Sequence, residues 1–119
     1  MPCLPIRLYG IKNCDTMKKA FAWLAAANIP HEFSDYKKAG VVAARLDTWL
    51  ARSDWKTLLN TRGLMWKKLE ASERVGVDAA KARELMLRYP VLIKRPVLET
   101  GDTLLVGFDP ERYREVLCA

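Results

Sequence analysis

The sequence has few cysteines and histidines, and their spacing matches neither a disulfide framework nor a metal site. The three cysteines, Cys3, Cys14 and Cys118, form no C-x-x-C pair, and His31 is the single histidine. Structural zinc sites and disulfide scaffolds need such residues in clusters. We therefore expect no bound metal, and we expect Cys3 and Cys118 to be reduced thiols near the ends of the chain.

Long apolar runs are absent as well. The longest, Phe21–Ala27, is far shorter than the roughly 20 residues that a helix needs to span a bilayer. The first residues also lack the basic region, apolar run and small-residue cleavage site of a secretory signal. These absences favour a cytoplasmic protein that does not contact a membrane.

The composition that is present is typical of one folded domain. The chain has 119 residues, of which 50% are hydrophobic, and no repeat or low-complexity linker interrupts it. We expect a single domain over residues 1–119 that acts as a monomer. The net charge of +6 is compatible with an anionic small molecule, an acidic protein or nucleic acid as partner, and does not choose among them.

The first third of the chain alternates between strand and helix patterns. Residues 6–9 and 32–36 alternate in polarity, as half-buried strands do. Between them, apolar side chains recur at helical spacing from Asp15 to Asn28, shortly before Pro30. A strand, a helix and a strand in this order predict a parallel pair with a right-handed crossover.

The rest of the chain has a helical middle and a β-hairpin near its end. Residues 41–90 show helical patterns in several short segments. Two short strands, 97–99 and 103–106, flank a turn, and Asp109 is positioned to cap a final helix. The order β-α-β, helical insert, β-β-α predicts an α/β protein with a thioredoxin-like fold and an all-helical insert over residues 41–90.

Three tryptophans of the insert, Trp49, Trp55 and Trp66, have two interpretations. With the neighbouring lysines they are compatible with stacking platforms for nucleic acid. Their helical spacing with leucines favours the core of the insert instead. We therefore expect a core role for all three and no nucleic-acid partner.

Cys14 carries the strongest functional signal. It follows the first strand and Gly10, and it directly precedes the first predicted helix. The unpaired N–H groups at a helix start and the helix macrodipole favour the thiolate, which is the nucleophile. An ordinary thiol, with a pKa of about 8.5, is only roughly 3% ionised at neutral pH. A buried, inert cysteine is the alternative, but Gly10, Asn13 and the polar residues that follow are typical of an open loop.

The motif that begins at Cys14 is C-x-x-M, because Met17 stands where a dithiol enzyme has its second cysteine. A catalytic cycle would therefore need another thiol, either from outside, such as glutathione, or from Cys3 or Cys118. A lowered pKa would also make Cys14 a better leaving group when that second thiol attacks a mixed disulfide.

Several cations are candidates to bind an anionic group beside Cys14. Arg95 precedes Pro96 at the entrance to the third strand, which in a thioredoxin-type sheet lies beside the cysteine loop, and a proline there is often cis. Arg62 lies in a loop of the insert, and Lys12 lies two residues before Cys14. Arginine suits carboxylates and oxyanions because its planar fork binds them through two hydrogen bonds.

Four segments, in order across almost the whole chain, carry a resemblance to a known family. They are Tyr9–Thr16, Leu58–Gly63, Leu92–Val97 and Val106–Phe108. Together they resemble the arsenate reductase-like (ArsC/Spx) family, and most closely its YffB-type branch. The resemblance implies a thioredoxin fold with a helical insert, a nucleophilic Cys14, and an anion-coordinating Arg95 beside a cis Pro96.

The chain departs from the better-known branches at a few positions. Arsenate reductases of this family that depend on glutathione or glutaredoxin use three arginines around the cysteine. Arg95 matches the middle one, whereas Asn60 stands where the first would lie, with Arg62 two residues later, and Gly107 stands at the third. A missing cation weakens arsenate binding, since a charge-assisted hydrogen bond contributes roughly 1.5–3 kcal/mol. Spx-type regulators, which bind RNA polymerase, commonly carry C-x-x-C instead of C-x-x-M.

We therefore expect a glutathione-dependent thiol-disulfide reductase, as the YffB-type resemblance implies. Cys14 and Arg95 are the predicted catalytic residues, and the predicted substrate- or anion-binding residues are Lys12, Asn13, Arg62 and Pro96. Glutathione acts as co-substrate, no cofactor is bound, and the other partner is a disulfide or an oxyanion, with glutaredoxin as a further candidate. The alternatives are an arsenate or oxyanion reductase coupled to glutathione or glutaredoxin, and an Spx-like regulatory module that docks on a larger protein.

Overall fold

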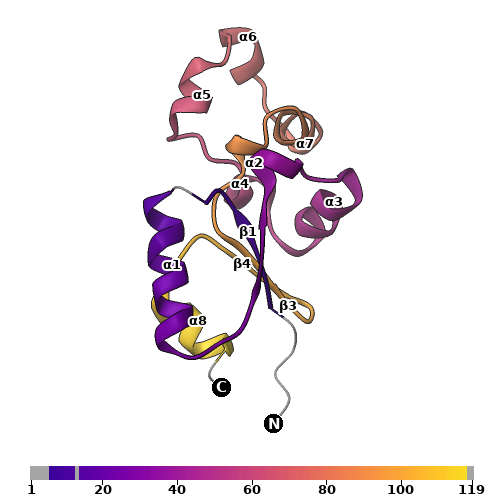
Figure 1. Cartoon of the computed structure of the whole chain (residues 1–119). Helices are drawn as coiled ribbons and strands as arrows, with labels where there is room; N and C mark the ends of the chain where they lie inside the picture. Colours follow the sequence, from indigo (N-terminus) through magenta and orange to yellow (C-terminus); the bar gives the residue numbers. More distant parts are fainter. Residues whose placement is uncertain (1–5, 13, 118–119) are drawn as a thin grey trace. The chain divides into compact units, whose positions relative to one another are not determined.

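The chain folds into two compact units (Figure 1). The computed structural model describes residues 6–12 and 14–117, so Cys3, Asn13 and Cys118 lie outside the described residues. One unit, here called the sheet unit, joins Met1–Asp35 to Arg95–Ala119, and the other, the helical unit, is Tyr36–Lys94. The predicted single domain with an insert over residues 41–90 stays a prediction.

The sheet unit contains a mixed four-stranded sheet in the order β2-β1-β3-β4. Strand β1 pairs parallel to β2 and antiparallel to β3, and β3 pairs antiparallel to β4. Its elements are β1 (Ile6–Gly10), α1 (Asp15–Ala26), β2 (Glu32–Asp35), β3 (Val97–Thr100), β4 (Thr103–Val106) and α8 (Pro110–Leu117). This is the predicted β-α-β half followed by the β-β-α half, and the fold is thioredoxin-like.

Local chemistry explains most of the boundaries in this unit. Gly101 takes a φ of 56° in the turn between β3 and β4, a left-handed conformation that glycine adopts readily. The Asp109 carboxylate accepts a hydrogen bond from the Glu111 N–H at 3.1 Å, which caps α8 as predicted. Helix α1 ends at Ala26, two residues before the predicted end, because Asn28 has a φ of 57° and leaves the helical conformation.

The helical unit consists of short helices packed around α7. They are α2 (Tyr36–Ala39), α3 (Ala43–Arg52), α4 (Trp55–Leu58), α5 (Leu64–Lys68), α6 (Ala71–Arg74), α7 (Ala79–Arg88) and the 3-10 helix η1 (Pro90–Leu92). Helices α3 and α4 contact α7, and α2 and α5 contact η1. Tyr36 begins α2 instead of ending β2 as predicted, because its ring is buried and its hydroxyl donates to the Ile93 carbonyl at 2.6 Å.

The prediction that three tryptophans form the core of the helical unit is correct for one of them. Trp49 is fully buried, but Trp55 and Trp66 are only half-buried. The Lys56 ammonium lies over the Trp55 ring, 5.7 Å from its centroid, in a cation–π contact. Leu58 and Leu69, the leucines near these two tryptophans in the sequence, are buried.

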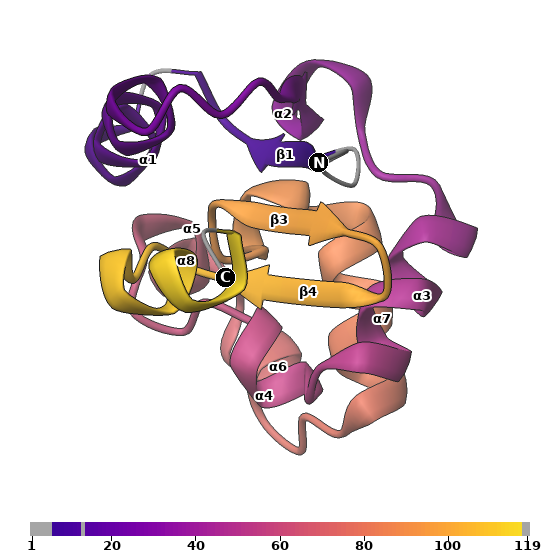
Figure 2. The ribbon, with the colours of Figure 1, turned by 90° about the horizontal axis from the view of Figure 1, so that it is seen from below.

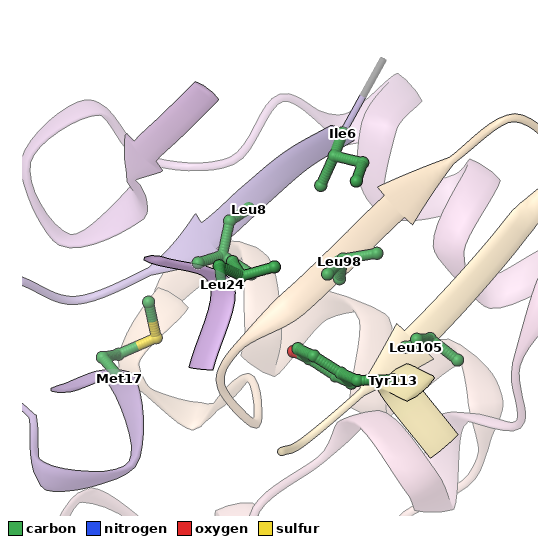
Figure 3. Close-up of a cluster of buried hydrophobic side chains, with 7 residues drawn as sticks. All are labelled: Ile6, Leu8, Met17, Leu24, Leu98, Leu105 and Tyr113. Carbon is green, nitrogen blue, oxygen red and sulfur yellow. The ribbon is translucent and has the colours of Figure 1, made fainter. Parts of the chain in front are cut away.

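Helices α1 and α8 cover one face of the sheet and enclose the core of the sheet unit (Figures 1 and 2). The buried cluster takes side chains from three strands and from both helices (Figure 3): Ile6, Leu8, Met17, Leu24, Leu98, Leu105 and Tyr113. Tyr113 points into this cluster, where Trp23 and Phe108 pack edge-on against its ring at centroid distances of 5.5 and 5.1 Å. Its hydroxyl has no hydrogen-bond partner among the described residues.

The Tyr113 hydroxyl predicts an unusual stabilising substitution. Burial of a hydroxyl without a partner costs free energy, and burial also raises the pKa of Tyr113 far above its usual range. Tyr113→Phe keeps the ring contacts and removes the hydroxyl, so we expect the free energy of unfolding to rise by about 1–2 kcal/mol in urea titrations. Tyr36→Phe is the matched control, because the buried Tyr36 hydroxyl donates a hydrogen bond. In that variant the free energy of unfolding should fall, by about as much as it rises in Tyr113→Phe. Equal effects of the two variants would contradict this reading of the core.

No helix within the described ranges is long and apolar enough to cross a membrane.

Candidate active site

Cys14 occupies the position immediately before the first turn of α1. Its backbone is extended, with φ −136° and ψ 135°, and its carbonyl accepts the Lys18 N–H at 2.9 Å. Cys14 is therefore the N-cap of the helix, the position from which a side chain faces the unpaired amides of the first turn. Its side chain is partly buried against the core of the sheet unit, and the sulfur is a free thiol.

The surroundings of Cys14 favour its ionised form. Partial burial raises the pKa of the thiol, but the Arg95 hydrogen bond, the backbone N–H groups of Met17 and Thr16, and the Arg95 charge lower it, and the net effect is a lowered pKa. The Cys14 side chain does not cap α1 through a hydrogen bond. The first amides of α1 therefore stabilise the thiolate through the partial positive charge at the helix start. The site therefore holds a higher fraction of thiolate at neutral pH than an ordinary cysteine.

Arg95 lies directly beside the sulfur. Its Nε–H donates to Cys14 Sγ at 3.3 Å, although the two residues are 81 positions apart in the sequence. The Arg95–Pro96 peptide bond is cis, as the resemblance implied, and Pro96 is buried at the entrance to β3. The Pro96 carbonyl accepts the Gly107 N–H at 2.8 Å, which ties this entrance to the end of β4. Sequence reasoning thus found both partners, and the structure brings them into contact.

Two contacts hold the end of β1 and the residues that follow it directly. At Gly10, a Cβ would lie only 2.8 Å from the Met17 Cε, so the absence of a side chain there lets Met17 pack under the end of β1. Further along, the Lys12 N–H donates to the Asp35 carboxylate at 3.3 Å, across the parallel pair in which Gly10 is opposite Asp35. These two contacts position Gly10 and Lys12, which lie shortly before Cys14 in the sequence.

The other predicted site residues have different surroundings. The Lys12 side chain is exposed on the β1–α1 loop, and Asn13 lies outside the described residues. Arg62 is exposed in the helical unit, in the loop after α4, and its backbone N–H donates to the Asn60 carboxamide oxygen at 3.0 Å. The roles of Lys12, Asn13 and Arg62 in binding a substrate or an anion stay predictions.

The two departures from the three-arginine pattern have local structural causes. The Asn60 carboxamide forms the turn that leads to Arg62, and its amide nitrogen lies 2.8 Å from the place of a Cβ at Gly63. Gly107 has a φ of 81°, a left-handed conformation that an arginine side chain would strain. Asn60 therefore stabilises the turn of its loop, and Gly107 allows the left-handed backbone of its own.

Sequence reasoning missed Asp35 and the role of Met17. An acidic residue at the end of the strand parallel to β1 was a usable signal for Asp35, because the ends of parallel neighbours lie side by side. Met17 was noted only as a missing cysteine, whereas its backbone N–H lowers the pKa of Cys14 and its side chain is fully buried. Within the residues that the structure describes, no group of three or more metal-ligating side chains is present.

The fold and this site together define a thioredoxin-like protein with one cysteine at the start of its first helix. The chain belongs to the ArsC family, whose family model matches residues 9–116. A solved YffB protein is 47% identical to this chain. The match covers 94% of this chain and 98% of the YffB protein, and the two structures superpose with a TM-score of 0.91. An arsenate reductase (ArsC) related protein of Brucella melitensis is 48% identical over 98% of this chain and 97% of its own, with a TM-score of 0.78.

Two further relatives show how widely this sequence pattern is used. An uncharacterised protein of Haemophilus influenzae is 37% identical over 92% of this chain and 96% of its own. The global transcriptional regulator Spx of Streptococcus pneumoniae is 23% identical over 94% of this chain and 85% of its own. This chain is therefore similar both to a protein described as arsenate reductase-related and to a transcriptional regulator.

Proposed function

We propose that this protein is a thiol-disulfide reductase in which Cys14 is the nucleophile. The observation that carries the proposal is the hydrogen bond from Arg95 Nε to Cys14 Sγ at the start of α1, which lowers the pKa of the thiol. A partly exposed thiolate held by a guanidinium is the arrangement that reactive cysteines use. Membership of the ArsC family supports the same chemistry.

The cycle needs two exchange steps. The Cys14 thiolate attacks the glutathione sulfur of a mixed disulfide between a substrate thiol and glutathione. The S–S bond between substrate and glutathione breaks, a new S–S bond joins Cys14 to glutathione, and the substrate leaves as its thiolate. The thiolate of a second glutathione then attacks the glutathione sulfur of the adduct, which releases glutathione disulfide and regenerates the Cys14 thiolate. In the net reaction one glutathione thiolate enters, and the substrate thiolate and glutathione disulfide leave. The substrate sulfur is reduced as the sulfur of the entering glutathione is oxidised, so no other reductant is required.

Glutathione is the proposed source of the second thiol because the chain offers no cysteine at the usual place. Met17 is fully buried beneath Gly10 and occupies the position of a resolving cysteine. A small, soluble thiol can approach Cys14 from solvent, since the Cys14 side chain is only partly buried. The lowered pKa also makes Cys14 a good leaving group in the second step.

Site-resolved mass spectrometry tests the proposal. We expect brief exposure of the reduced protein to glutathione disulfide to modify Cys14 faster than Cys3 and Cys118. Because the Cys14 pKa is lowered, the modification rate should reach half its maximum at a pH below the pKa of an ordinary thiol. The rate should fall only when the pH drops below the pKa of Cys14, where the thiolate is protonated. Added glutathione should remove the adduct. Equal rates at all three cysteines would contradict the proposal.

Oxyanion reduction is the second candidate, because a relative at 48% identity is described as arsenate reductase-related. The local roles of Asn60 and Gly107 count against it, since neither position can offer a guanidinium to a bound oxyanion. Arsenate added to the same glutathione mixture separates the two activities: oxidation of glutathione that requires arsenate would favour the second candidate.

A further inference from the structure

The positive charge of this protein is concentrated in one of its two units. The helical unit contains 13 lysines and arginines and 6 acidic residues, for a net charge of +7, whereas the sheet unit contains 7 and 8, for a net charge of −1. The excess positive charge of the chain therefore belongs to the unit that does not contain Cys14. Such an asymmetry steers the approach of charged partners.

The acidic residues of the helical unit are all used within its own fold. Asp47 pairs with Arg83, with Oδ1 and Nε 2.6 Å apart, and Asp54 and Asp78 cap α4 and α7. Glu70 and Glu73 form the capping box of α6. Arg88 pairs with Glu73 and with Glu84. These carboxylates neutralise their own neighbourhoods and leave other cations uncompensated.

Four such cations gather in a short stretch that we call the basic segment, residues 62–75. Arg62, Lys67, Lys68 and Arg74 are exposed, and their side chains have no acidic partner within the described part of the chain. Between and beside them, Leu64 and Val75 are 74% and 64% exposed, and they are two of the three large apolar residues with that exposure among the described residues.

Helix α6, in the second half of the basic segment, is attached to α7 through Lys81. The Lys81 ammonium donates to the carbonyls of Ser72 and Val75, which satisfies the last carbonyls of α6. The capping box fixes the other end of the same helix. Arg74 and Val75 are thus presented at the end of a helix that is held at both ends, and a preorganised surface loses less free energy to ordering on binding.

We infer that the basic segment is a docking surface for an acidic segment of a partner protein. Exposed aliphatic side chains that alternate with exposed cations along one short stretch of chain supply both the apolar and the charged contacts that a protein interface uses. Single-stranded nucleic acid would be expected to use exposed aromatic platforms, whereas Trp66, the aromatic side chain of the basic segment, is half-buried. Helices α5 and α6 are too short to lie in a membrane interface as amphipathic helices. The inference rests on the proposed function in one respect: the partner is taken to be the thiol protein that Cys14 reduces, so acidic proteins are its substrate class.

The test compares two glutathionylated peptides of equal length, one acidic and one uncharged. For the wild-type protein at low salt, we expect kcat/KM to be roughly 10-fold higher with the acidic peptide, and the difference to fade as salt screens the charges. Neutralising three cations of the basic segment together (Lys67→Gln, Lys68→Gln, Arg74→Gln) should remove most of that preference and leave the uncharged peptide unaffected.

A matched control removes the same charge from the sheet unit (Lys19→Gln, Arg112→Gln, Arg114→Gln), and it should change the preference less than about 2-fold. Equal losses in the two triple variants would show that only net charge matters and would overturn the inference. So would an absence of preference in the wild type.

Direct binding keeps the inference separate from the proposed function. Fluorescence anisotropy of a labelled acidic peptide without a disulfide should report binding that the basic-segment variant loses, even if no peptide is reduced. Failure to reduce any peptide would defeat the proposed function alone. Tighter binding to a single-stranded oligonucleotide or to anionic phospholipid vesicles than to the acidic peptide would overturn the inference.

Discussion

Replacing Cys14 by serine is expected to abolish thiol transfer while the fold is retained. A serine hydroxyl is not ionised at neutral pH and cannot form the mixed disulfide, so turnover of any glutathionylated substrate should fall to background. Cys14 is the N-cap of α1, and serine is among the preferred residues at that position because its oxygen accepts amide hydrogen bonds. The variant should therefore unfold at the same urea concentration as the wild type, or a higher one.

Two single variants complete the Cys14 test. Cys3→Ser and Cys118→Ser should each keep the activity of the wild type, because the proposed cycle takes its second thiol from glutathione. The turnover of all three variants is measured as formation of glutathione disulfide, which glutathione reductase reports through oxidation of NADPH. Residual turnover in Cys14→Ser would contradict the assignment of the nucleophile, and a loss of turnover in Cys118→Ser would show that an internal thiol resolves the adduct.

The fold was largely predictable because its signals are local. Alternating polarity identified β1 and β2, the turn at Gly101 identified the hairpin of β3 and β4, and the Asp109 cap identified the start of α8. The small discrepancies arise where long-range contacts decide. Tyr36 continues a strand pattern in the sequence, but its hydroxyl bonds to Ile93, 57 residues away, and it therefore begins α2.

The candidate site was predictable in its members and unpredictable in its geometry. Cys14 and Arg95 were found from a helix start, an Arg-Pro pair and a family resemblance, and they are now seen to be hydrogen-bonded. No sequence pattern reveals that Met17 fills the space left by Gly10, because that contact depends on how α1 meets the end of β1. Likewise, the positive φ of Gly107 explains a missing arginine only when the backbone is known.

The second large effect is expected from Arg95→Met, which removes the hydrogen bond and the charge beside Cys14. Burial raises the pKa of Cys14, and the hydrogen bond from Arg95 is the strongest of the influences that lower it, so the pKa should rise in the variant. The thiolate is the reactive form, so alkylation by iodoacetamide at neutral pH should slow by roughly 5- to 10-fold. At a pH above both pKa values the thiol is ionised in both proteins, and the two rates should converge.

Arg95 could act by lowering the pKa of Cys14, by binding an anionic group of the substrate, or by both, and the charge of the reagent separates these roles. Iodoacetamide is neutral and reports the thiolate alone, whereas iodoacetate carries a carboxylate that a guanidinium can bind. If Arg95 also binds anions, Arg95→Met should slow iodoacetate more than iodoacetamide, and the excess should persist at high pH, where both thiols are ionised. Arg95→Lys keeps the charge without the planar fork, so it should preserve part of the attraction for iodoacetate. An unchanged pH profile in Arg95→Met would mean that the amides of α1 alone hold the thiolate, because Arg95 would then have no influence on its formation.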